Sequence, residues 1–348
     1  MINADFVLMP IFAGRMNKRS KGTKMEKVFI KEFKNGENIA TIFILNRKEV
    51  KRTKTDKLYA EFTLIDKTGK IEARLWDNVE KYANKAETGD VVLVEGSVVE
   101  FRDEKQIKVD SLKKMSDGTF DYGDLVRVVE GRDDLFKKVS TYLSEIKNPW
   151  LKALVESFLL DTDFVKRFCD GVGAKSWHNA YIGGLLEHTY DVMTIVDKAC
   201  SLYPEADRDM ALFGAFLHDT GKIYELDEKK MEYTIEGGLI GHIVIGYKML
   251  VKRMESIKDF PKDLAMRMEH IILSHHGEYE QQSPVLPKTL EATIVYHADE
   301  LVSQANAIKE IKRAQGGEGK EWSNFITIKN RKYFIRDTKE ESWDNSPA

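Results

Sequence analysis

Alternating apolar and polar residues recur along the chain from about residue 27 to residue 115. In the run 58–65 the residues at even positions are Leu, Ala, Phe and Leu, and a second alternating run occupies 71–76. A turn of sequence Asp-Lys-Thr-Gly at 66–69 separates the two runs. A period of two residues places every second side chain on the same face of a strand. The pattern therefore predicts a β-hairpin with one buried face.

Further short runs surround this hairpin. Residues 38–46, 91–99 and 106–112 have strand-like patterns, and 79–86 has the spacing of a short helix. A strand, a hairpin, a short helix and a second hairpin in succession is the order of elements in a small five-stranded OB-fold barrel. We therefore expect an all-β OB-fold nucleic-acid-binding domain over residues 25–115.

Beyond residue 131 the spacing of apolar residues changes to the helical period of 3.6. This period predicts an all-α domain over residues 131–337, joined to the barrel by a linker at 116–130. Near its end, the short runs 325–329 and 332–336 flank a turn and predict a β-hairpin. The helices are expected at 132–146, 149–160, 177–201, 208–219, 239–256, 262–275 and 289–314.

The two ends of the chain differ from both domains. Residues 1–24 hold five Lys and Arg residues but lack the long apolar core of a secretory signal, and residues 338–348 are polar. We expect both segments to be disordered.

Composition narrows the class of protein. The net charge is −3, so contact with nucleic acid has to come from a local basic patch. No apolar stretch is long enough to cross a bilayer, which argues against a membrane protein. Cys169 and Cys200 are isolated, so neither a disulfide framework nor a thiolate zinc site is indicated. We expect a cytoplasmic protein.

Histidine is confined to the helical half, where all eight histidines lie beyond residue 177. A lone histidine on an apolar stripe, such as His188 or His242, is more often a buried core residue than a ligand. The adjacent pair His218 and Asp219 differs, because it follows the helix segment 211–217, which has no polar side chain. Burying an unpaired carboxylate is costly, and a bound cation would offset that cost. Imidazole and carboxylate suit divalent metals, so the pair favours a metal site.

Two motifs give this site a family resemblance. The segment 177–189 reads WHNAYIGGLLEHT, and the segment 216–222 reads FLHDTGK. These motifs resemble the HD phosphohydrolase superfamily and, within it, the YhaM-type 3′-to-5′ exoribonuclease family, which joins an OB-fold to an HD domain. The resemblance extends over residues 27–335, so it covers the architecture as well as the motifs.

The resemblance implies two divalent ions per chain, roughly 4 Å apart as in other two-metal sites. Manganese is favoured, and iron, cobalt, magnesium and zinc stay open because the ligand types do not select among them. The implied ligands are His188, His218, Asp219 and Asp299 for one ion, and His242, His275 and His276 for the other, with Asp219 bridging.

The resemblance also assigns catalytic roles to Asp219, Lys222 and His178. Lys222 would stabilise charge on the phosphate, and His178 would contact the substrate phosphate. From its spacing alone, Lys222 is equally well explained as a solvated lysine near a helix end. His270 and His297 are expected to lie outside the ligand set.

The predicted barrel offers a surface for single-stranded nucleic acid. Aromatic side chains can stack on bases, and nearby cations can bind phosphates. The candidate contacts are Tyr59, Arg74 and Trp76 on the outer face of the hairpin, and Arg47, Lys51 and Arg52 in the adjoining loop. A solvated charge run is the simpler interpretation of the loop, and glutamates on the same face weaken the patch.

These features predict a metal-dependent 3′-to-5′ exoribonuclease that degrades single-stranded RNA, with DNA open as a second substrate, to nucleoside 5′-monophosphates. One alternative is an HD-domain phosphodiesterase for cyclic dinucleotides or nucleotides, but the Gly-Tyr-Pro element of one such branch does not occur in the sequence. The other is a non-catalytic nucleic-acid-binding factor, although every implied ligand is present. The sequence leaves open whether the chain forms a homo-oligomer.

Overall fold

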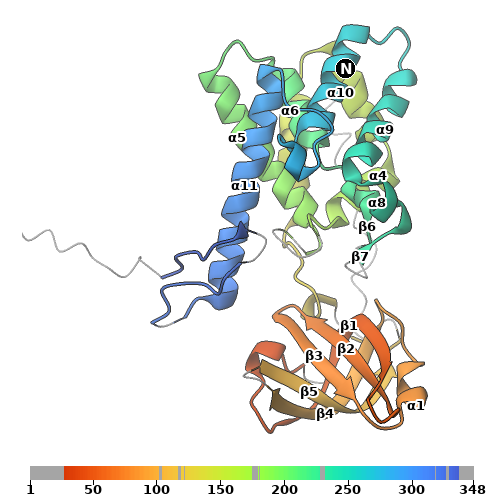
Figure 1. The fold of residues 1–348 in the computed structure, drawn as a ribbon. Coiled ribbons are helices and arrows are strands. Elements are labelled where there is room, and N and C mark those ends of the chain that lie inside the picture. The colour runs from red at the N-terminus through yellow and green to blue at the C-terminus, as the bar shows by residue number, and fades with distance from the viewer. Residues whose placement is uncertain are drawn as a thin grey trace, which may run out of the picture.

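The computed structural model describes residues 27–101, 104–116, 119–120, 122–174, 179, 181–227, 232–317, 319–326 and 329–336. Within them the chain forms a β-barrel followed by a bundle of helices, with the barrel at one end of the bundle (Figure 1). The segments 1–24 and 338–348, expected to be disordered, lie outside the described residues, as does His178.

The barrel is closed by strands in the order β1-β2-β3-β5-β4. Its elements are β1 (Asn38–Arg52), β2 (Leu58–Asp66), β3 (Gly69–Leu75), α1 (Val79–Ala83), β4 (Val91–Phe101) and β5 (Glu104–Lys114). Strands β3 and β5 are parallel and pair Ala73 with Ile107, whereas the other neighbours are antiparallel. This arrangement confirms the predicted OB-fold.

The alternating hairpin residues fill the barrel as predicted. Ala60, Phe62 and Leu64 on β2 and Ile71 and Leu75 on β3 are at most 5% exposed. The register pairs Ala60 with Leu75 and Leu64 with Ile71, so these side chains share one face. The residues between them therefore point away from the core.

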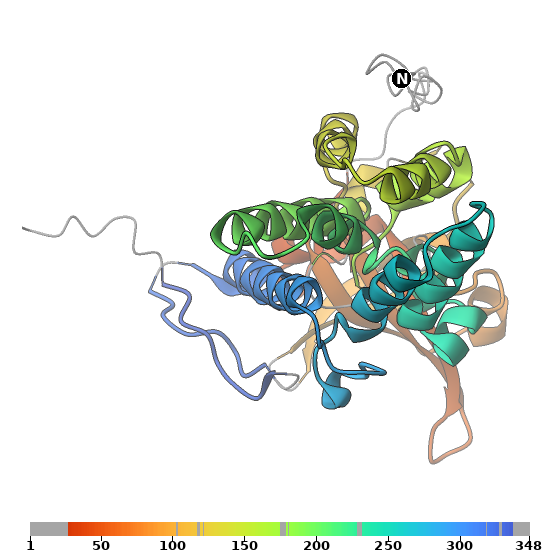
Figure 2. The same ribbon diagram turned by 90° about the horizontal axis from the view of Figure 1, so that it is seen from above.

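The helical part is built around α6 (Arg208–Leu217), in which every residue from Met210 to Leu217 is buried. The other α-helices of this part are α2 (Arg132–Ser144), α3 (Pro149–Leu159), α4 (Thr162–Asp170), α5 (Gly184–Leu202), α7 (Lys222–Glu225), α8 (Ile235–Ile240), α9 (His242–Glu255), α10 (Lys262–Ser274) and α11 (Leu290–Gln315). Helices α5 and α11 lie side by side and both pack against α6 (Figure 2). In the described part of the chain, no helix combines the length and apolar character needed to cross a membrane.

Helix boundaries differ from the prediction where the backbone leaves the right-handed region. The helix expected from 177 begins at Gly184, after Asn179 and Gly183 with φ of 53° and 80°. The helix expected from 239 begins at His242, after Gly241 with φ of 77°. Positive φ values interrupt a right-handed helix, so both starts are shifted toward the C-terminus.

Several short elements were not predicted, among them α4, α7, most of α8, and the strands β6 and β7. Helix α4 begins where the Asp161 side chain accepts a hydrogen bond from the backbone N–H of Phe164. Strands β6 (Leu226–Asp227) and β7 (Glu232–Tyr233) form a short antiparallel pair. The hairpin expected near the C-terminus appears as two isolated bridges, Trp322 with Phe334 and Ile326 with Arg331.

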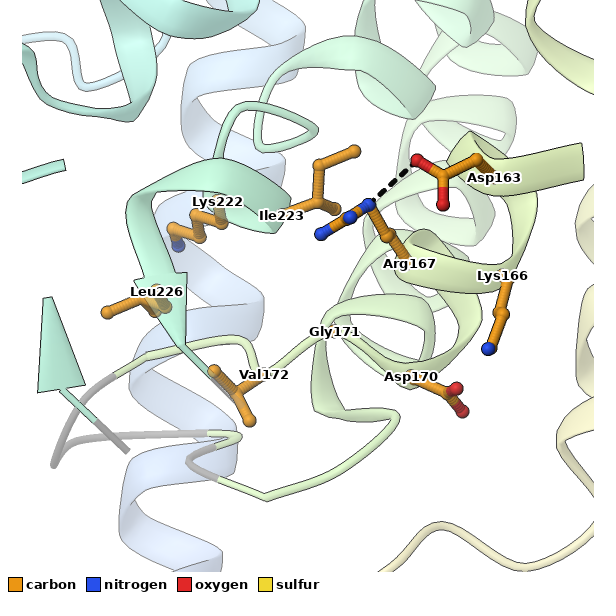
Figure 3. Close-up of a pocket in the computed structure, with 9 residues that line it drawn as sticks. All are labelled: Asp163, Lys166, Arg167, Asp170, Gly171, Val172, Lys222, Ile223 and Leu226. Carbon is orange, nitrogen blue, oxygen red and sulfur yellow. Dashed lines mark hydrogen bonds and ion pairs between the residues drawn. The ribbon is translucent and has the colours of Figure 1, made fainter. Parts of the chain in front are cut away.

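The described residues of the segment 116–130, which was expected to be a linker, include several that pack between the barrel and the helices. Leu125 and Val126 are 0% and 6% exposed and contact apolar residues of β1 and β4. Val128 forms a parallel bridge with Ile182, just before α5. Close to this interface, a pocket opens between α4 and α7 (Figure 3).

Candidate metal centre

The first group of candidate ligands comes from three segments that are distant in the sequence. His188 lies on α5, His218 and Asp219 follow α6, and Asp299 lies on α11. His188 Nε2 is 3.1 Å from Asp299 Oδ1 and 3.1 Å from His218 Nε2. His218 Nε2 is 3.3 Å from Asp219 Oδ2. The structure therefore brings all of these side chains together in the buried core.

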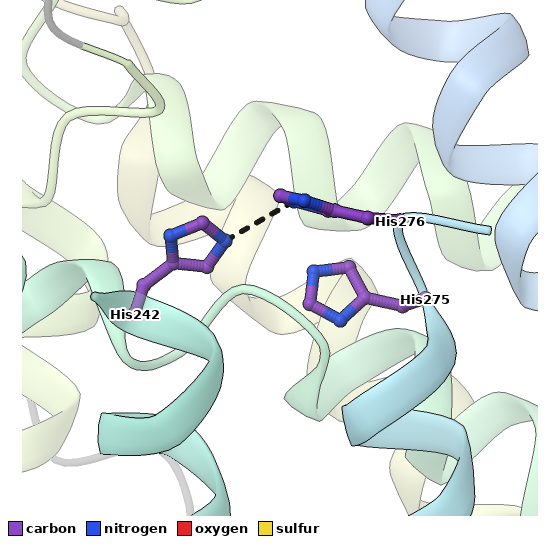
Figure 4. Close-up of side chains that lie close together, drawn as sticks. All are labelled: His242, His275 and His276. Atoms are coloured by element: carbon purple, nitrogen blue, oxygen red, sulfur yellow. Dashed lines mark hydrogen bonds between the residues drawn. The ribbon is translucent and has the colours of Figure 1, made fainter. Parts of the chain in front are cut away.

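The second group contains His242, at the start of α9, and the pair His275 and His276, which follows α10 (Figure 4). His242 Nε2 is 3.3 Å from His276 Nε2. Asp219 Oδ1 is 3.5 Å from His242 Nε2 and 3.8 Å from His275 Nε2. Asp219 thus lies between the two groups, with one carboxylate oxygen toward each.

Hydrogen bonds that Nδ1 donates orient the imidazole rings. The Nδ1 atoms of His218, His275 and His276 each lie 2.7 Å from a backbone carbonyl oxygen, and His242 Nδ1 lies 2.9 Å from Glu225 Oε1. Because these oxygens only accept, Nδ1 has to donate, and in a neutral ring Nε2 then carries the lone pair. In all four histidines Nε2 is the atom that faces the cluster, which is the arrangement that a metal ion requires.

The carboxylates of the cluster are held in the ionised form. Burial opposes ionisation of Asp219, but Lys222 and His218 outweigh it and hold the pKa of this carboxyl well below its usual value. Burial is likewise outweighed at Asp299, where His188 and His218 lower the pKa. The centre therefore holds negative charge in a buried place, and negative charge there attracts a cation.

The imidazoles respond in two ways. Burial and the neighbouring His276 lower the pKa of His275 well below its ordinary value, and burial and His242 lower the pKa of His276. At His218, burial lowers the pKa, but Asp219 outweighs it and raises the pKa overall. A lowered pKa keeps His275 and His276 ready to donate a lone pair, while the raised pKa of His218 reflects the same carboxylate charge that a bound cation would neutralise.

Two buried atoms point to missing partners. Among the residues that the structure describes, Asp219 Oδ1 and His275 Nε2 make no hydrogen bond, although Asp219 is 2% and His275 0% exposed. A buried polar atom without a partner costs free energy, and metal coordination would satisfy both atoms. The nitrogen and oxygen donor set, and the two groups that could each hold an ion, fit divalent metals.

Lys222 lies at the edge of the cluster. Its Nζ atom is 2.6 Å from Asp219 Oδ2, and its side chain is only 11% exposed. Asp219 outweighs the effect of burial and raises the pKa of Lys222, so the ammonium stays charged. This burial does not fit the alternative of a solvated lysine at a helix end.

Glu225 belongs to the site, but the sequence did not indicate it. Its Oε1 atom accepts hydrogen bonds from the His242 backbone N–H and ring Nδ1, both at 2.9 Å. Burial opposes ionisation of Glu225, but His242 outweighs it and lowers the pKa. Its contacts depend on the fold of α7 against α9, which no spacing in the sequence reveals. His270 lies apart from the cluster, since its Nε2 accepts from the Lys288 backbone N–H at 2.9 Å.

The outer face of the barrel brings the predicted aromatic residues together. Tyr59 and Trp76 stack on each other, with ring centroids 4.9 Å apart and an angle of 14° between the planes. The Arg74 guanidinium lies 5.7 Å from the Phe101 ring and 3.4 Å from Glu61. Stacked rings beside a guanidinium are the kind of surface that binds single strands.

The prediction of a basic loop was wrong, because β1 extends to Arg52 and carries Arg47, Lys51 and Arg52. The charges of these residues are largely paired with acidic residues. Arg47 forms an ion pair with Glu49, Lys51 pairs with both Glu49 and Glu61, and Arg52 pairs with Asp56 at 3.0 Å. These pairs are exposed, and exposed pairs exchange partners at little cost. They nevertheless reduce the positive potential that the sequence alone suggested.

Two family models match this chain, one in the barrel and one in the helical part. Residues 45–115 match the family described as OB-fold nucleic acid binding domain, and residues 185–303 match the HD domain. A domain of replication protein A from Methanococcus maripaludis is 21% identical over 26% of this chain and 97% of that chain, with a TM-score of 0.23. The single-stranded DNA binding protein from Thermus aquaticus is 20% identical over 23% of this chain and 41% of that chain, with a TM-score of 0.22.

Two full-length relatives match both parts of the chain. The 3′-5′ exoribonuclease YhaM of Geobacillus sp. is 30% identical over 287 residues, which are 80% of this chain and 86% of that protein. The 3′-5′ exoribonuclease YhaM of Listeria innocua is 29% identical over 315 residues, which are 89% of this chain and 98% of that protein. The chain, with its OB-fold barrel followed by an HD domain, therefore belongs to the YhaM family of 3′-5′ exoribonucleases.

Proposed function

We propose that this protein is a divalent-metal-dependent 3′-to-5′ exoribonuclease that degrades single-stranded RNA to nucleoside 5′-monophosphates. The observation that carries the proposal is the position of Asp219 between two groups of inward-facing ligand atoms, within 3.8 Å of His275 and 3.3 Å of His218. The 3′-to-5′ direction rests on the two relatives, which bear that activity in their names.

We assign the metal ligands on this basis. His188, His218, Asp219 and Asp299 would hold one ion, and His242, His275 and His276 would hold a second together with Asp219. Manganese is favoured, with iron, cobalt, magnesium and zinc as the other ions that such ligands accept. When bound, divalent ions supply charge neutralisation at the phosphate and a water molecule of lowered pKa as the nucleophile.

The side chains of the chain then have separate tasks. Asp219 offers one oxygen to each group, and Glu225 keeps the His242 ring turned so that Nε2 faces inward. Lys222 carries a buried positive charge 2.6 Å from Asp219, where it can bind a phosphate oxygen and stabilise the charge that develops there. His178 is the proposed contact to the substrate phosphate.

The barrel would bind the strand. Tyr59 and Trp76 provide a sequence-independent stacking surface, and Arg74, Arg47, Lys51 and Arg52 are the proposed phosphate contacts. Since these cations already have acidic neighbours, we expect modest, salt-sensitive affinity. In this proposal residues 25–115 bind the strand, residues 116–130 connect the two domains, and residues 131–337 hydrolyse the strand.

A single assay separates the proposed function from its alternatives. Single-stranded RNA labelled at its 5′ end, the matching DNA and a cyclic dinucleotide are incubated with the protein, with manganese or with a chelator. Metal-dependent shortening of the RNA from its 3′ end, with release of nucleoside 5′-monophosphates, supports the proposal. Opening of the cyclic dinucleotide without shortening of RNA would favour the small-ligand phosphodiesterase, and binding without turnover would favour a non-catalytic factor.

A further inference from the structure

The pocket between α4 and α7 has a chemistry that the metal centre does not explain. It measures about 130 Å³ and is lined by residues of both helices and of the segment that follows α4. Lys166, Arg167 and Lys222 are its cations, and Asp163 and Asp170 are its acids. A small concave site with a surplus of positive charge fits an anion.

Lys222 connects the pocket to the metal centre. It lines the pocket, and its Nζ atom lies 2.6 Å from Asp219 Oδ2. A group held in this pocket therefore lies next to the candidate ligand that faces both histidine groups. Figure 3 shows Lys222 on one wall and the Arg167 side chain reaching toward α7 from the other.

The opposite side of the pocket adjoins the barrel. Val172 and Leu226, which both line the pocket, are buried and pack together against Ile65 of β2. The pocket thus lies between the barrel and the metal centre. An RNA strand that extends from the barrel to the metal centre can therefore pass this pocket.

The two cations that α4 contributes to the pocket are exposed. Lys166 is exposed and has no ion pair or hydrogen bond among the described residues. Arg167 Nε is 2.8 Å from Asp163 Oδ2, but both side chains are exposed, at 46% and 65%. An exposed pair of this kind is worth little, so a phosphate can replace the carboxylate on the guanidinium fork. Asp170 is already paired with Arg132, which reduces its repulsion of an anion.

We propose that this pocket binds an internal phosphate of the RNA strand, one or a few nucleotides before the bond that is cut, through Arg167 and Lys166. The inference rests on the proposed function and adds a contact between the two domains. Base-independent contacts of this kind hold the strand in register while successive nucleotides are removed. The pocket would favour a strand over a dinucleotide, because only a strand has a phosphate at that distance.

Substitutions of charged residues on α4 test the proposal, because removing a cation should raise the KM for RNA and removing an acid should lower it. In Arg167→Ala and in Lys166→Ala, we expect the KM for a single-stranded oligoadenylate to rise about 3- to 10-fold. The slope of log(kcat/KM) against log salt should decrease by about 0.7 for each cation removed. In Asp163→Asn, which removes the competing carboxylate, the KM should fall, and a folding defect does not produce that result. Lys198→Ala, an exposed lysine on α5, is the matched control.

The outcomes distinguish the subsite from the activity. Bis(p-nitrophenyl) phosphate is a small diester that does not reach the pocket, so its turnover reports the metal centre alone. RNA turnover of each variant is divided by turnover of this diester, and the ratio should drop for Arg167→Ala and Lys166→Ala. If both variants match Lys198→Ala in KM and in salt slope, the subsite is refuted while the exonuclease activity stands. If adenosine 5′-monophosphate inhibits the wild type but not these variants, and the salt slope for RNA is unchanged, the pocket binds released product and the proposed strand contact is wrong. If the wild type does not shorten RNA at all, the proposed function itself fails.

Discussion

At the scale of single residues, the site depends on Asp219. Its two oxygens face different histidine groups, and its charge is the one that Lys222 and His218 stabilise in the buried core. A buried carboxylate with one unsatisfied oxygen is costly unless a cation completes it. The same residue therefore links the energetics of the core to the proposed chemistry.

Replacing Asp219 with Asn keeps its shape but removes its charge. We expect the Asp219→Asn variant to bind fewer divalent ions than the wild type, which should hold about two per chain, and to lose hydrolysis at least about 1000-fold. Binding of RNA to the barrel should persist, since Asp219 lies in the helical domain and is not part of the barrel surface. Elemental analysis of protein purified without chelators, together with a strand-binding assay, measures both quantities. Asp263→Asn, an exposed residue on α10, serves as the control, and equal metal content in the two variants would contradict the assignment of Asp219.

Glu225 is predicted to act through His242. Glu225→Ala removes the acceptor that holds His242 Nδ1 at 2.9 Å, so the ring is free to turn. Loss of such an orienting partner typically lowers metal affinity about 10- to 100-fold. Titration of activity with manganese should give a midpoint shifted to higher metal concentration by this factor, with most of the maximal rate recovered at saturation. An unchanged midpoint, equal to that of the exposed-residue variant Glu236→Ala, would exclude this orienting role.

The sequence predicted which residues form this site, but it did not predict the hydrogen-bond acceptors that orient the histidine rings. His218 and Asp219 stood out because they follow a helix segment without polar side chains, and the motif resemblance supplied His188, His242, His275, His276 and Asp299. All of these side chains converge in the structure, although their metal binding stays a prediction. The hydrogen bond of His242 Nδ1 with Glu225 could not be predicted, because it arises only when α7 and α9 are packed together. The carbonyl acceptors of the other three rings are close in the chain, but the spacing of residues does not show which way a ring turns.

At the scale of secondary structure, close backbone packing positions the ligands. A Cβ atom added at Gly221 would lie 2.0 Å from the His242 carbonyl oxygen. The start of α7 therefore touches the start of α9, and this contact sets the distance between Asp219 and His242. Only glycine allows the two backbones to approach so closely.

Substitution of this glycine should disturb both the fold and the site. In Gly221→Ala the added methyl group has to push α9 away, which we expect to destabilise the protein by about 1–3 kcal/mol. The shift should also weaken binding at the His242 group. Gly238→Ala on α8 is a matched control, since a Cβ there has no atom within 4 Å, and it should be neutral or slightly stabilising. Chemical denaturation of metal-free protein measures the difference, and equal stability of both variants would contradict the packing argument.

Helix boundaries illustrate why element-scale prediction was incomplete. The apolar spacing identified the longer helices of this part but missed α4, and the start of α5 depends on Asn179 and Gly183, which have positive φ. Gly184 approaches the Asn179 carbonyl oxygen so closely that a Cβ would lie 2.1 Å from it. These conformations result from tertiary contacts, to which a periodic pattern is insensitive. The parallel pairing of β3 with β5 is non-local for the same reason, and only the order of elements in the OB-fold made it foreseeable.

At the scale of the whole molecule, the barrel and the helical part are joined by an apolar contact. Leu125 is fully buried at this contact, in the segment that the sequence suggested was a linker. Composition alone could not distinguish a mobile connector from one that packs, because the partners of Leu125 come from β1 and β4. The pocket that contains Arg167 adjoins the same boundary through Val172 and Leu226.

Weakening the apolar contact between the barrel and the helical part should reduce hydrolysis of RNA more than hydrolysis of a small diester. Leu125→Ala removes buried methyl groups and leaves a cavity, which typically costs about 2–5 kcal/mol. We expect calorimetry to resolve two unfolding transitions in the variant where the wild type has one, because the cavity weakens the apolar contact that couples the barrel to the helical part. If the barrel guides the strand toward the metal centre, turnover of RNA should fall more than turnover of bis(p-nitrophenyl) phosphate. Leu202→Ala, at a position 76% exposed, should keep the single unfolding transition and the wild-type ratio of RNA to diester turnover. Equal losses on the two substrates in Leu125→Ala would mean that the contact supports the helical domain itself, and that the barrel binds RNA without directing it.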